Sequence, residues 1–523
     1  MENNNTEHMG KPTEFLLTPE TERAQVNFFK KNVTTELSSD YTLPDYLPEI
    51  RKMLGINAKI SPISRYIGGS GIEFSGRVDY DIIYVGGDGK LSSVPLGADF
   101  SFDVQPEVPT HIDWNSSNDA FADVETDMLH CRVTAPRKLN VKCRLHAMVR
   151  AYGYDDICSD LKGCDGNAER LINDVSSMKI QRQMSEVIEL SDEIPTDIPT
   201  ENIRVISAQS NVSIGDTSES GGRLNCRGEV IAEILYENSE NGDLHQAKKR
   251  IPFSQEIEAD NTESLGNSSV NIRGISGETK ISLGANKLLL DTEVILEAEK
   301  AKNIPISVTQ DIYIPGKETN AEYRDFRFET LKKCANATLT VTCSIPINDL
   351  SLSEESEIID SHATARAEGL TLDGNDLIIS GNCKIRIISK AGDEYFSEET
   401  TLPFSLDTAL SFDEEKLTLF GIPSVTDCRC RLEGTNASIE VDIFMPYSIT
   451  QEQTVRIAES VQCSGHSSAP RSGITVYYPT NGERLWDVAK RFGTSLRNLA
   501  EANDLPGVKG EQIISDKNYI IVY

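Results

Sequence analysis

The sequence predicts a mainly β protein made of three tandem all-β domains followed by a small βααβ module. A pattern of a glycine, an alternating strand and a polar turn occurs three times at nearly equal intervals. Residues 473–523 have a different pattern, with helical periodicity between two short β-branched segments. At 523 residues the chain is also too long for one ordinary hydrophobic core, so several domains are expected.

The repeated pattern is anchored by Gly76, Gly228 and Gly381, which lie 152 and 153 residues apart (228 − 76 and 381 − 228). Apolar and polar residues alternate after each glycine, which is typical of a half-buried strand. A polar turn of hairpin character follows each strand, and a Phe-Ser pair then opens the next strand. The turns are 86–89, 241–243 and 391–393, and the phenylalanines are Phe100, Phe253 and Phe404.

Each predicted domain closes with a further alternating strand, and the first two domains also begin alike. The segment 43–48 has prolines at its second and last positions, as does the segment 194–199. The third domain departs from this pattern, because 311–316 reads Asp-Ile-Tyr-Ile-Pro-Gly without a second proline four residues on. The period is too long for a solenoid, so tandem copies of one β domain are favoured. The closing strands begin at Leu139, Leu288 and Ile439.

Polar segments between the alternating patterns are interpreted as connections. The predicted organisation is an N-terminal arm at 1–32, β domains at 33–153, 184–300 and 304–462, linkers at 154–183 and 463–472, and the module at 473–523.

Composition excludes several classes of function. The chain has 51 Lys and Arg against 82 Asp and Glu, a net charge of −31, and residues 1–472 account for all of this excess. Such an acidic surface argues against nucleic acid and anionic lipid as partners and favours a basic or apolar partner. The alternative is that the acidity only keeps the protein in solution. The N-terminus lacks the pattern of a secretion signal, and no apolar run is long enough for a membrane span. Eleven scattered cysteines indicate reduced thiols in a cytosol.

The C-terminal pattern predicts strand, helix, helix, strand. Residues 474–478 and 519–522 are rich in β-branched and aromatic residues, as strands are. Gly493 ends the first helix, and Thr494 or Ser495 can cap the second. Trp486 and Phe492 are expected in the core, because so small a domain needs an aromatic anchor. The apolar positions of the two helices are Leu485, Val488, Ala489, Phe492, Leu496, Leu499 and Ala500.

This module resembles a LysM domain, a family that binds N-acetylglucosamine polymers in peptidoglycan and chitin. The resemblance rests on Gly482-Glu483-x-Leu485-Trp486, on Val488-Ala489-x-x-Phe492-Gly493-Thr494-Ser495, and on Leu499, Asn503 and Leu505. The family usually has Pro-Gly-Asp-Thr before its Leu-Trp and Pro-Gly-Gln before its last strand. Here 481–484 and 515–518 differ in those two loops, which form the sugar groove in the family.

The resemblance implies that a ligand or protein partner is bound by the altered loops and the neighbouring helix surface. Arg484, which replaces a small threonine, would crowd a sugar acetamide yet suits a carboxylate on a protein partner. Arg484, Asp487, Arg491 and Asn503 are expected at the surface. The candidate binding residues are Asn481, Gly482, Glu483, Arg484, Asp487, Arg491, Asn503, Ser515, Asp516, Lys517 and Asn518.

No pattern indicates catalysis, a cofactor or a metal. The pairs His130-Cys131 and Cys143/His146 could be imagined as zinc ligands, but cysteines in strands are more often small buried hydrophobes. Cys428 and Cys430 are interpreted in the same way. The glycine-rich stretches lack the Lys-Ser/Thr of a phosphate loop, and no nucleophile elbow is present, so an enzyme is not expected.

Tandem β domains followed by a LysM-like module, without a signal peptide, resemble the SPOCS-domain proteins of endospore-forming Firmicutes, of the SipL type. The resemblance implies a protein of the mother-cell cytoplasm at the forespore surface, which scaffolds the spore coat. Its partners would be the coat's morphogenetic ATPase, SpoIVA, docked through the LysM module, and other coat proteins. The alternative is a peptidoglycan-binding wall protein, and a hydrolase targeted by LysM is a third class.

Overall fold

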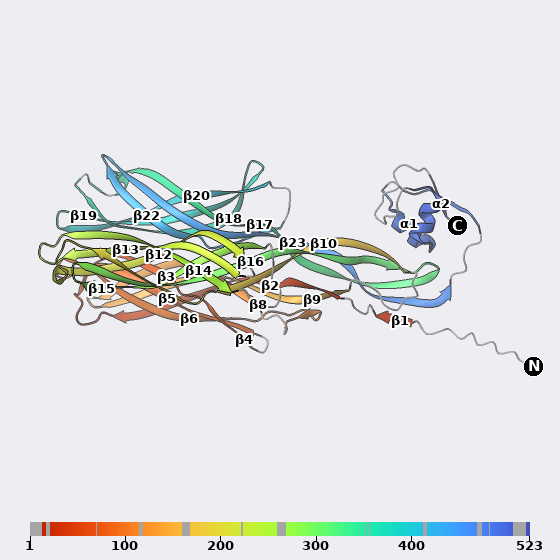
Figure 1. The fold of residues 1–523 in the computed structure, drawn as a ribbon, viewed down its shortest axis with the longest axis horizontal. Helices are drawn as coiled ribbons and strands as arrows, with labels where there is room; N and C mark the ends of the chain where they lie inside the picture. Colours follow the sequence, from red (N-terminus) through yellow and green to blue (C-terminus); the bar gives the residue numbers. More distant parts are fainter. Residues whose placement is uncertain are drawn as a thin grey trace, which may run out of the picture.

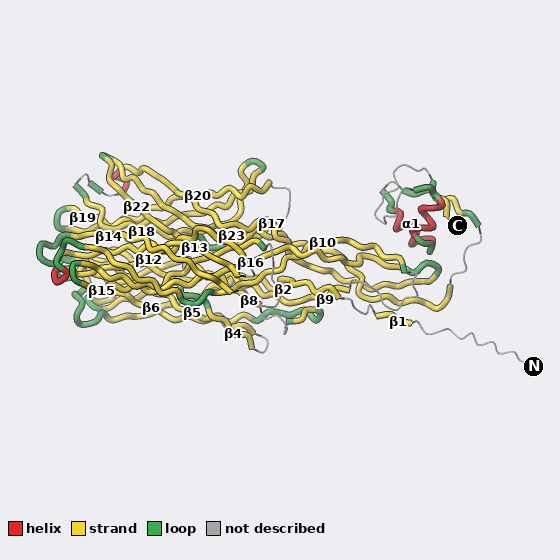
Figure 2. Tube along the Cα trace, in the orientation of Figure 1, coloured by secondary structure: helices red, strands yellow, loops and turns green. Residues whose placement is uncertain are grey.

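The computed structural model describes residues 13–16, 21–68, 71–114, 119–158, 168–220, 223–258, 268–350, 352–353, 355–411, 416–467, 473–480, 482–505 and 519–522. The molecule is mainly β, as predicted, and it is elongated (Figures 1 and 2). A wide body of sheets narrows into a stalk of long strands, and two short helices lie beside the stalk's end (Figure 1).

Three successive stretches of chain, 21–158, 169–313 and 317–467, each form a sheet of long strands and a sheet of shorter ones. In the first stretch the long-strand sheet is β2–β9–β7 with β8 also on β9, and the short-strand sheet is β3–β5–β4 with β6 also on β5. The bounds are β2 Thr21–Thr42, β3 Ile50–Ile60, β4 Ser64–Gly68, β5 Gly71–Gly86, β6 Leu91–Val104, β7 Ile112–Asp113, β8 Asp119–Ala135 and β9 Lys138–Cys158.

The second stretch repeats this plan. Its long-strand sheet is β10–β16–β11 with β15 also on β16, and its short-strand sheet is β12–β13–β14. The bounds are β10 Glu169–Met184, β11 Ile188–Pro195, the 3-10 turn η1 Thr200–Asn202, β12 Ile203–Ser220, β13 Arg223–Asn238, β14 Leu244–Glu258, β15 Ser269–Gly284 and β16 Lys287–Tyr313.

The third stretch has the longest strands. β17 and β23 pair over nearly their whole lengths, β21, β22 and the N-terminal β1 also pair with β23, and β18–β19–β20 form the short-strand sheet. The bounds are β1 Thr13–Leu16, β17 Lys317–Pro346, η2 Ile347–Leu350, β18 Glu357–Asp373, β19 Asp376–Ala391, β20 Glu394–Ser411, β21 Leu417–Phe420, β22 Ser424–Glu433 and β23 Asn436–Ser467.

In each stretch the two sheets pack face to face over a separate hydrophobic core. In the first stretch Val78 and Tyr80 of β5 share a cluster with Val141 and Cys143 of β9. The second and third stretches have corresponding cores between β13 and β16 and between β19 and β23. Burial of alternate residues on both inner faces is how an aligned β-sandwich is held together.

The repeated Gly and Phe signals pair with each other across strands. Gly76 lies opposite Phe100, Gly228 opposite Phe253, and Gly381 opposite Phe404. A Cβ on any of these glycines would come within 3.0 Å of the facing phenylalanine ring. The aromatic ring therefore covers the space that a side chain would fill, which fixes the register of each hairpin. The turns predicted at 86–89, 241–243 and 391–393 are confirmed as connections between these strands.

The three short-strand sheets meet at an apolar cluster on a common axis. The first strand of each sheet has a β-bulge, which leaves Leu54, Ile206 and Ile359 without a cross-strand partner. All three are buried in one cluster with residues of β5, β13 and β19. Two of the bulge carbonyls also accept bonds from the preceding stretch, from Ser93 Oγ to Ile206 and from Gln246 Nε2 to Ile359. A bulge changes the direction in which a side chain points, and here it turns one apolar residue of each stretch toward the other two stretches.

The long-strand sheets meet at a polar contact. Arg150 of β9, Glu299 of β16 and Ser448 of β23 are separated by equal intervals (299 − 150 and 448 − 299 both give 149), and all three are buried. Arg150 Nη2 donates to Glu299 Oε2 at 2.9 Å, and Ser448 Oγ donates to Glu299 Oε1 at 3.2 Å. Glu299 of the second stretch therefore contacts the corresponding residue of each of the other two stretches.

Strands also occupy segments that the sequence predicted as connections. Residues 21–32 of the predicted arm belong to β2. Of the first predicted linker, residues 154–158 belong to β9 and residues 169–183 to β10. Strand β23 continues to Ser467, into the second predicted linker. The predicted domain limits at 33–153, 184–300 and 304–462 therefore fall within strands, and the break at 301–303 lies inside β16. These strands form the stalk, where Ile306, Val308, Phe326 and Phe328 are buried between polar neighbours. The remaining residues of the arm and linkers lie outside the described residues, β1 excepted.

Candidate functional site

The C-terminal module consists of β24 (Thr475–Tyr477), α1 (Leu485–Phe492), α2 (Leu496–Ala502) and β25 (Ile520–Val522), with β24 and β25 paired antiparallel. Gly493 ends α1 in the left-handed conformation with φ of 64°, and the Ser495 hydroxyl caps α2 by accepting a bond from the Asn498 amide at 3.1 Å. Trp486 is fully buried, as predicted for a core residue.

The module is docked on the end of the stalk. Its core is continuous with Leu171 of β10 and Tyr313 of β16. The rings of Tyr313 and Trp486 meet edge to face with 4.9 Å between centroids, and the Tyr313 hydroxyl donates to the Thr494 carbonyl at 2.8 Å. The Gly316 amide donates to the Gly493 carbonyl at 2.9 Å. Aromatic packing and two hydrogen bonds therefore join the module to the segment 313–316.

Asp311 is the charged centre of this contact. Its carboxylate accepts bonds from Trp486 Nε1 at 2.7 Å and from Lys490 Nζ at 2.7 and 2.8 Å. The Tyr323 hydroxyl donates to the same carboxylate. Burial opposes ionisation of Asp311, but the bonds from Lys490, Tyr323 and Trp486 outweigh burial and lower its pKa. One carboxylate of the stalk thus binds an indole and an ammonium group of α1.

The sequence analysis missed Asp311 and Lys490, although one signal pointed to the segment that contains Asp311. The segment 311–316 is where the third domain departs from the proline pattern of the other two. In the structure this segment forms the surface on which the module docks, because Asp311, Tyr313 and Gly316 all contact the module. The module's partner for Asp311 is Lys490, a half-buried lysine one turn after Trp486 on α1, and a single lysine has no distinguishing pattern in the sequence.

We expect Asp311→Asn to loosen the module from the stalk. The substitution keeps the shape but removes the charge that faces Lys490, and hydrogen bonds to charged groups contribute about 1.5–3 kcal/mol each. Because the folded pKa of Asp311 is lowered, its contribution is complete above the pKa of an unfolded Asp, about 3.9, and is lost as pH falls through the folded value. Limited proteolysis between pH 3 and 7 would measure cleavage at the junction of stalk and module.

The matched control for this substitution is Glu501→Gln, which removes the exposed partner of Arg497 on α2. We expect Glu501→Gln to be cleaved like the unsubstituted protein. Equal protease resistance of Asp311→Asn and the unsubstituted protein at neutral pH would show that Asp311 does not hold the module.

The described candidate residues of the module form two small clusters. Glu483 accepts bonds from the Tyr477 hydroxyl at 3.0 and 2.9 Å and pairs with Arg491 Nη2 at 3.1 Å, and Arg491 also lies over the Tyr477 ring. Arg484 binds Asp487 through two bonds of 2.9 Å across the first turn of α1. Gly482 lies beside these residues in a turn with φ of 87°. These side chains bring charge together at the start and end of α1.

Asn503 does not join them. The expectation that it lies at the surface is wrong, because Asn503 is 5% exposed. Its amide Nδ2 donates to the Leu499 and Ile521 carbonyls at 2.8 and 2.7 Å, and its Oδ1 accepts from the Ile521 amide at 2.7 Å. Asn503 therefore fastens α2 to β25, as a buried amide with satisfied bonds does. Asn481, Ser515, Asp516, Lys517 and Asn518 lie outside the described residues.

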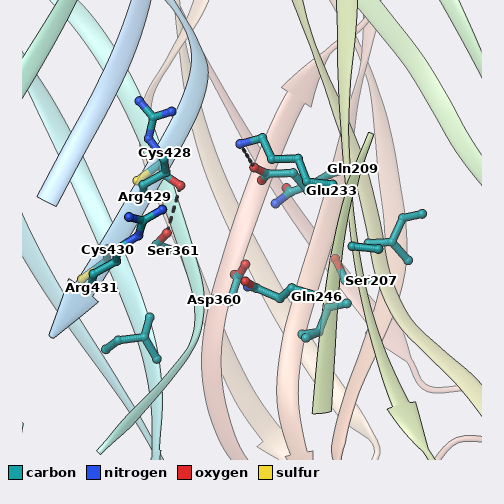
Figure 3. A pocket seen from close by; sticks show the side chains of 15 residues that line it. Ser207, Gln209, Glu233, Gln246, Asp360, Ser361, Cys428, Arg429, Cys430 and Arg431 are labelled. Carbon is teal, nitrogen blue, oxygen red and sulfur yellow. Dashed lines mark hydrogen bonds and ion pairs between the residues drawn. The ribbon is translucent and has the colours of Figure 1, made fainter. Parts of the chain in front are cut away.

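A second polar site lies in the body, between β12–β14 of the second stretch and β18 and β22 of the third (Figure 3). Lys248 pairs with Glu233 at 2.9 Å and also with Asp427, and Ser361 Oγ donates to the Cys428 carbonyl at 3.1 Å. Burial raises the pKa of Cys428 to about 12 and that of Cys430 to about 11. Both thiols are therefore protonated at neutral pH and are poor nucleophiles.

The cysteines that were weighed as metal ligands are core residues. Cys143 is buried in the first hydrophobic core and Cys131 packs against it, and Cys428 and Cys430 belong to the third core. Within the described ranges, no group of three or more His, Cys, Asp or Glu side chains is placed to hold a metal ion. Among the same residues, no helix has the length and apolar composition of a membrane span.

The fold defines a mainly β protein whose three stretches of chain share one pattern of sheets around a common axis. Residues 203–277 match the family model described as SipL, SPOCS domain. The matched segment begins with β12 and ends within β15, so it covers the short-strand sheet of the second stretch. This match supports a SipL-type protein and suggests a role related to sporulation. No curated protein and no solved structure matches the chain.

Proposed function

We propose that the chain is a non-enzymatic scaffold of spore coat assembly, composed of three SPOCS domains and a C-terminal LysM module. The observation that carries this proposal is the match of residues 203–277 to the SipL SPOCS domain. The Gly–Phe pair and the β-bulge within the matched segment recur at Gly76, Phe100 and Leu54 and at Gly381, Phe404 and Ile359. These recurrences favour the same domain in the first and third stretches.

The scaffold acts in the mother cell at the forespore surface, where its module binds the coat's SpoIVA-like ATPase and its body contacts other coat proteins. The cluster of Glu483, Arg484, Asp487 and Arg491 is the proposed contact. Docking of the module on the stalk supports this function, because a rigidly held module presents its charged face without the entropy cost of ordering a loose tether. Several weak contacts along one chain raise the overall binding affinity, because the first contact holds the other sites close to their partners.

We expect Arg484→Ala to weaken capture of the ATPase by the full-length protein by about tenfold, which corresponds to about 1.4 kcal/mol. The guanidinium is held toward the surface by Asp487, so its removal takes away a preorganised charge without touching the core. Pull-down of purified ATPase, with a denaturation midpoint measured in parallel, would give affinity and folding separately.

Arg497→Ala provides the matched control, because Arg497 forms a comparable exposed pair with Glu501 on α2. It should leave capture unchanged. The same proteins would be offered purified peptidoglycan. Retention on the glycan without capture of the ATPase would overturn the scaffold proposal in favour of a wall-binding protein, and unchanged capture by Arg484→Ala would remove Arg484 from the interface.

A further inference from the structure

A cavity of about 940 Å³ lies between all three stretches. Its walls come from β3 and β5 of the first stretch, β12 and β15 of the second, and β18 of the third. Several lining residues, including Asp79, Glu278 and Glu293, are exposed, so the cavity reaches the surface. Its volume falls within the range of sites that hold small organic molecules.

Lys59 is the unusual side chain in this cavity. Its Nζ donates to the Ser210 carbonyl at 3.3 Å and to the Gly277 carbonyl at 3.2 Å, which ties the first stretch to the second. Among the described residues no carboxylate forms an ion pair with it. Asp79, whose charge favours the ammonium form of Lys59, binds Arg77 at 2.7 Å. Burial lowers the pKa of Lys59 to about 8. The ammonium group is thus desolvated and lacks a full counter-charge.

The other charged groups of the cavity are compensated or exposed. Arg366 pairs with Glu125 and Asp127, and Arg77 pairs with Asp79 and Asp99. The half-buried carboxylate of Asp81 accepts a bond from Ser207 Oγ at 3.3 Å and interacts electrostatically with Arg386. Arg273 also lines the cavity, and its charge helps to lower the pKa of Asp123. Lys59 is therefore a desolvated cation of this cavity that has only neutral carbonyl partners among the described residues.

We propose that this cavity binds a small anionic ligand, a carboxylate or phosphate compound, whose charged group is held by Lys59. A ligand there would contact all three stretches and would lock their arrangement around the axis. Because it binds the folded body alone, it would also raise the thermal stability of the whole protein by mass action. The site is remote from the C-terminal module and is independent of partner binding there.

The test uses full-length protein with inorganic phosphate or citrate as probes, against sodium chloride at matched ionic strength. We expect at least one probe to bind in calorimetry and to raise the melting temperature, and we expect Lys59→Met to bind it at least tenfold more weakly. Lys384→Met is the matched control, because Lys384 forms an exposed pair with Glu399 on the outer surface. Binding of phosphate alone or of citrate alone would identify which anion the site prefers.

A second measurement needs no substitution and covers the case in which Lys59→Met fails to fold. Limiting acetylation of the unsubstituted protein, read by mass spectrometry, should modify Lys59 more slowly when the probe is present and leave Lys384 unaffected. Absence of binding by both anions would overturn the proposal. So would binding that neither protects Lys59 nor depends on it, because the anion would then lie on the outer surface.

Discussion

Gly228→Ala is expected to destabilise the protein by about 3 kcal/mol, at the upper end of the cost of overpacking. A Cβ at this position would lie 2.5 Å from the Ser213 carbonyl oxygen and 2.7 Å from the Phe253 ring. The oxygen belongs to the neighbouring strand of the same sheet, so it cannot move away without breaking the ladder between β12 and β13. The urea midpoint of unfolding would measure the loss.

The matched control is Gly215→Ala in the same sheet, where the nearest atom to an added Cβ is the Arg227 carbonyl oxygen at 3.4 Å. It should be neutral or slightly stabilising, because alanine restricts the unfolded chain more than glycine does. If both substitutions shifted the midpoint equally, the glycine pattern would reflect general strand propensity and not the close approach of Phe253.

The mainly β fold and the repeated hairpins could be predicted because their signals are local. A glycine and a phenylalanine about two dozen residues apart face each other across one turn, and alternation marks the buried face of each strand. The stalk could not be predicted in this way. Its strands alternate Phe326 and Phe328 with charged residues, so their mean composition resembles that of a linker.

The candidate site also has residues that could be predicted from the sequence and residues that could not. The pairs Glu483–Arg491 and Arg484–Asp487 lie within the module, and their residues could be chosen as candidates from local sequence. Asp311 lies 175 positions before its partner Trp486, and nothing local reveals that an aspartate will meet an indole so far along the chain. The exposure of Asn503 was predicted wrongly because a short polar residue after a helix is usually exposed. Here its side chain is hydrogen-bonded to Ile521 of the last strand.

The polar contact between the long-strand sheets has no sequence signal, because equivalent positions carry different chemistry. Arg150, Glu299 and Ser448 are equivalent by their spacing, yet one is a cation, one an anion and one a hydroxyl. A trimer of identical chains could not place three different residues on its axis. A single chain whose three stretches share one pattern of sheets can, and the difference between the stretches replaces a clash of like groups with a bonded network.

Glu299→Gln is therefore expected to cost about 3–5 kcal/mol, the usual penalty for breaking a buried ion pair by removing one partner. Glu299 Oε2 accepts from Arg150 Nη2 at 2.9 Å and from Arg182 Nη2 at 2.7 Å, and Asp123 binds the same two guanidiniums at 3.0 and 2.7 Å. Without Glu299, two buried cations share Asp123 and the more distant Glu297. The loss would be measured as a shift of the urea midpoint at pH 7.

Glu256→Gln is the matched control, because Glu256 pairs with Arg223 at the surface, where such pairs contribute only about 0–1 kcal/mol.

Burial opposes ionisation of Glu299, but the charges of Arg150 and Arg182 outweigh burial and lower its pKa. Its contribution is thus complete above the pKa of an unfolded Glu, about 4.3, and is lost as pH falls through the folded value. The difference between Glu299→Gln and the unsubstituted protein should therefore shrink on acidification. A difference that stays constant with pH would mean that Glu299 acts by packing, and the axis would then owe its stability to the apolar cluster of Leu54, Ile206 and Ile359.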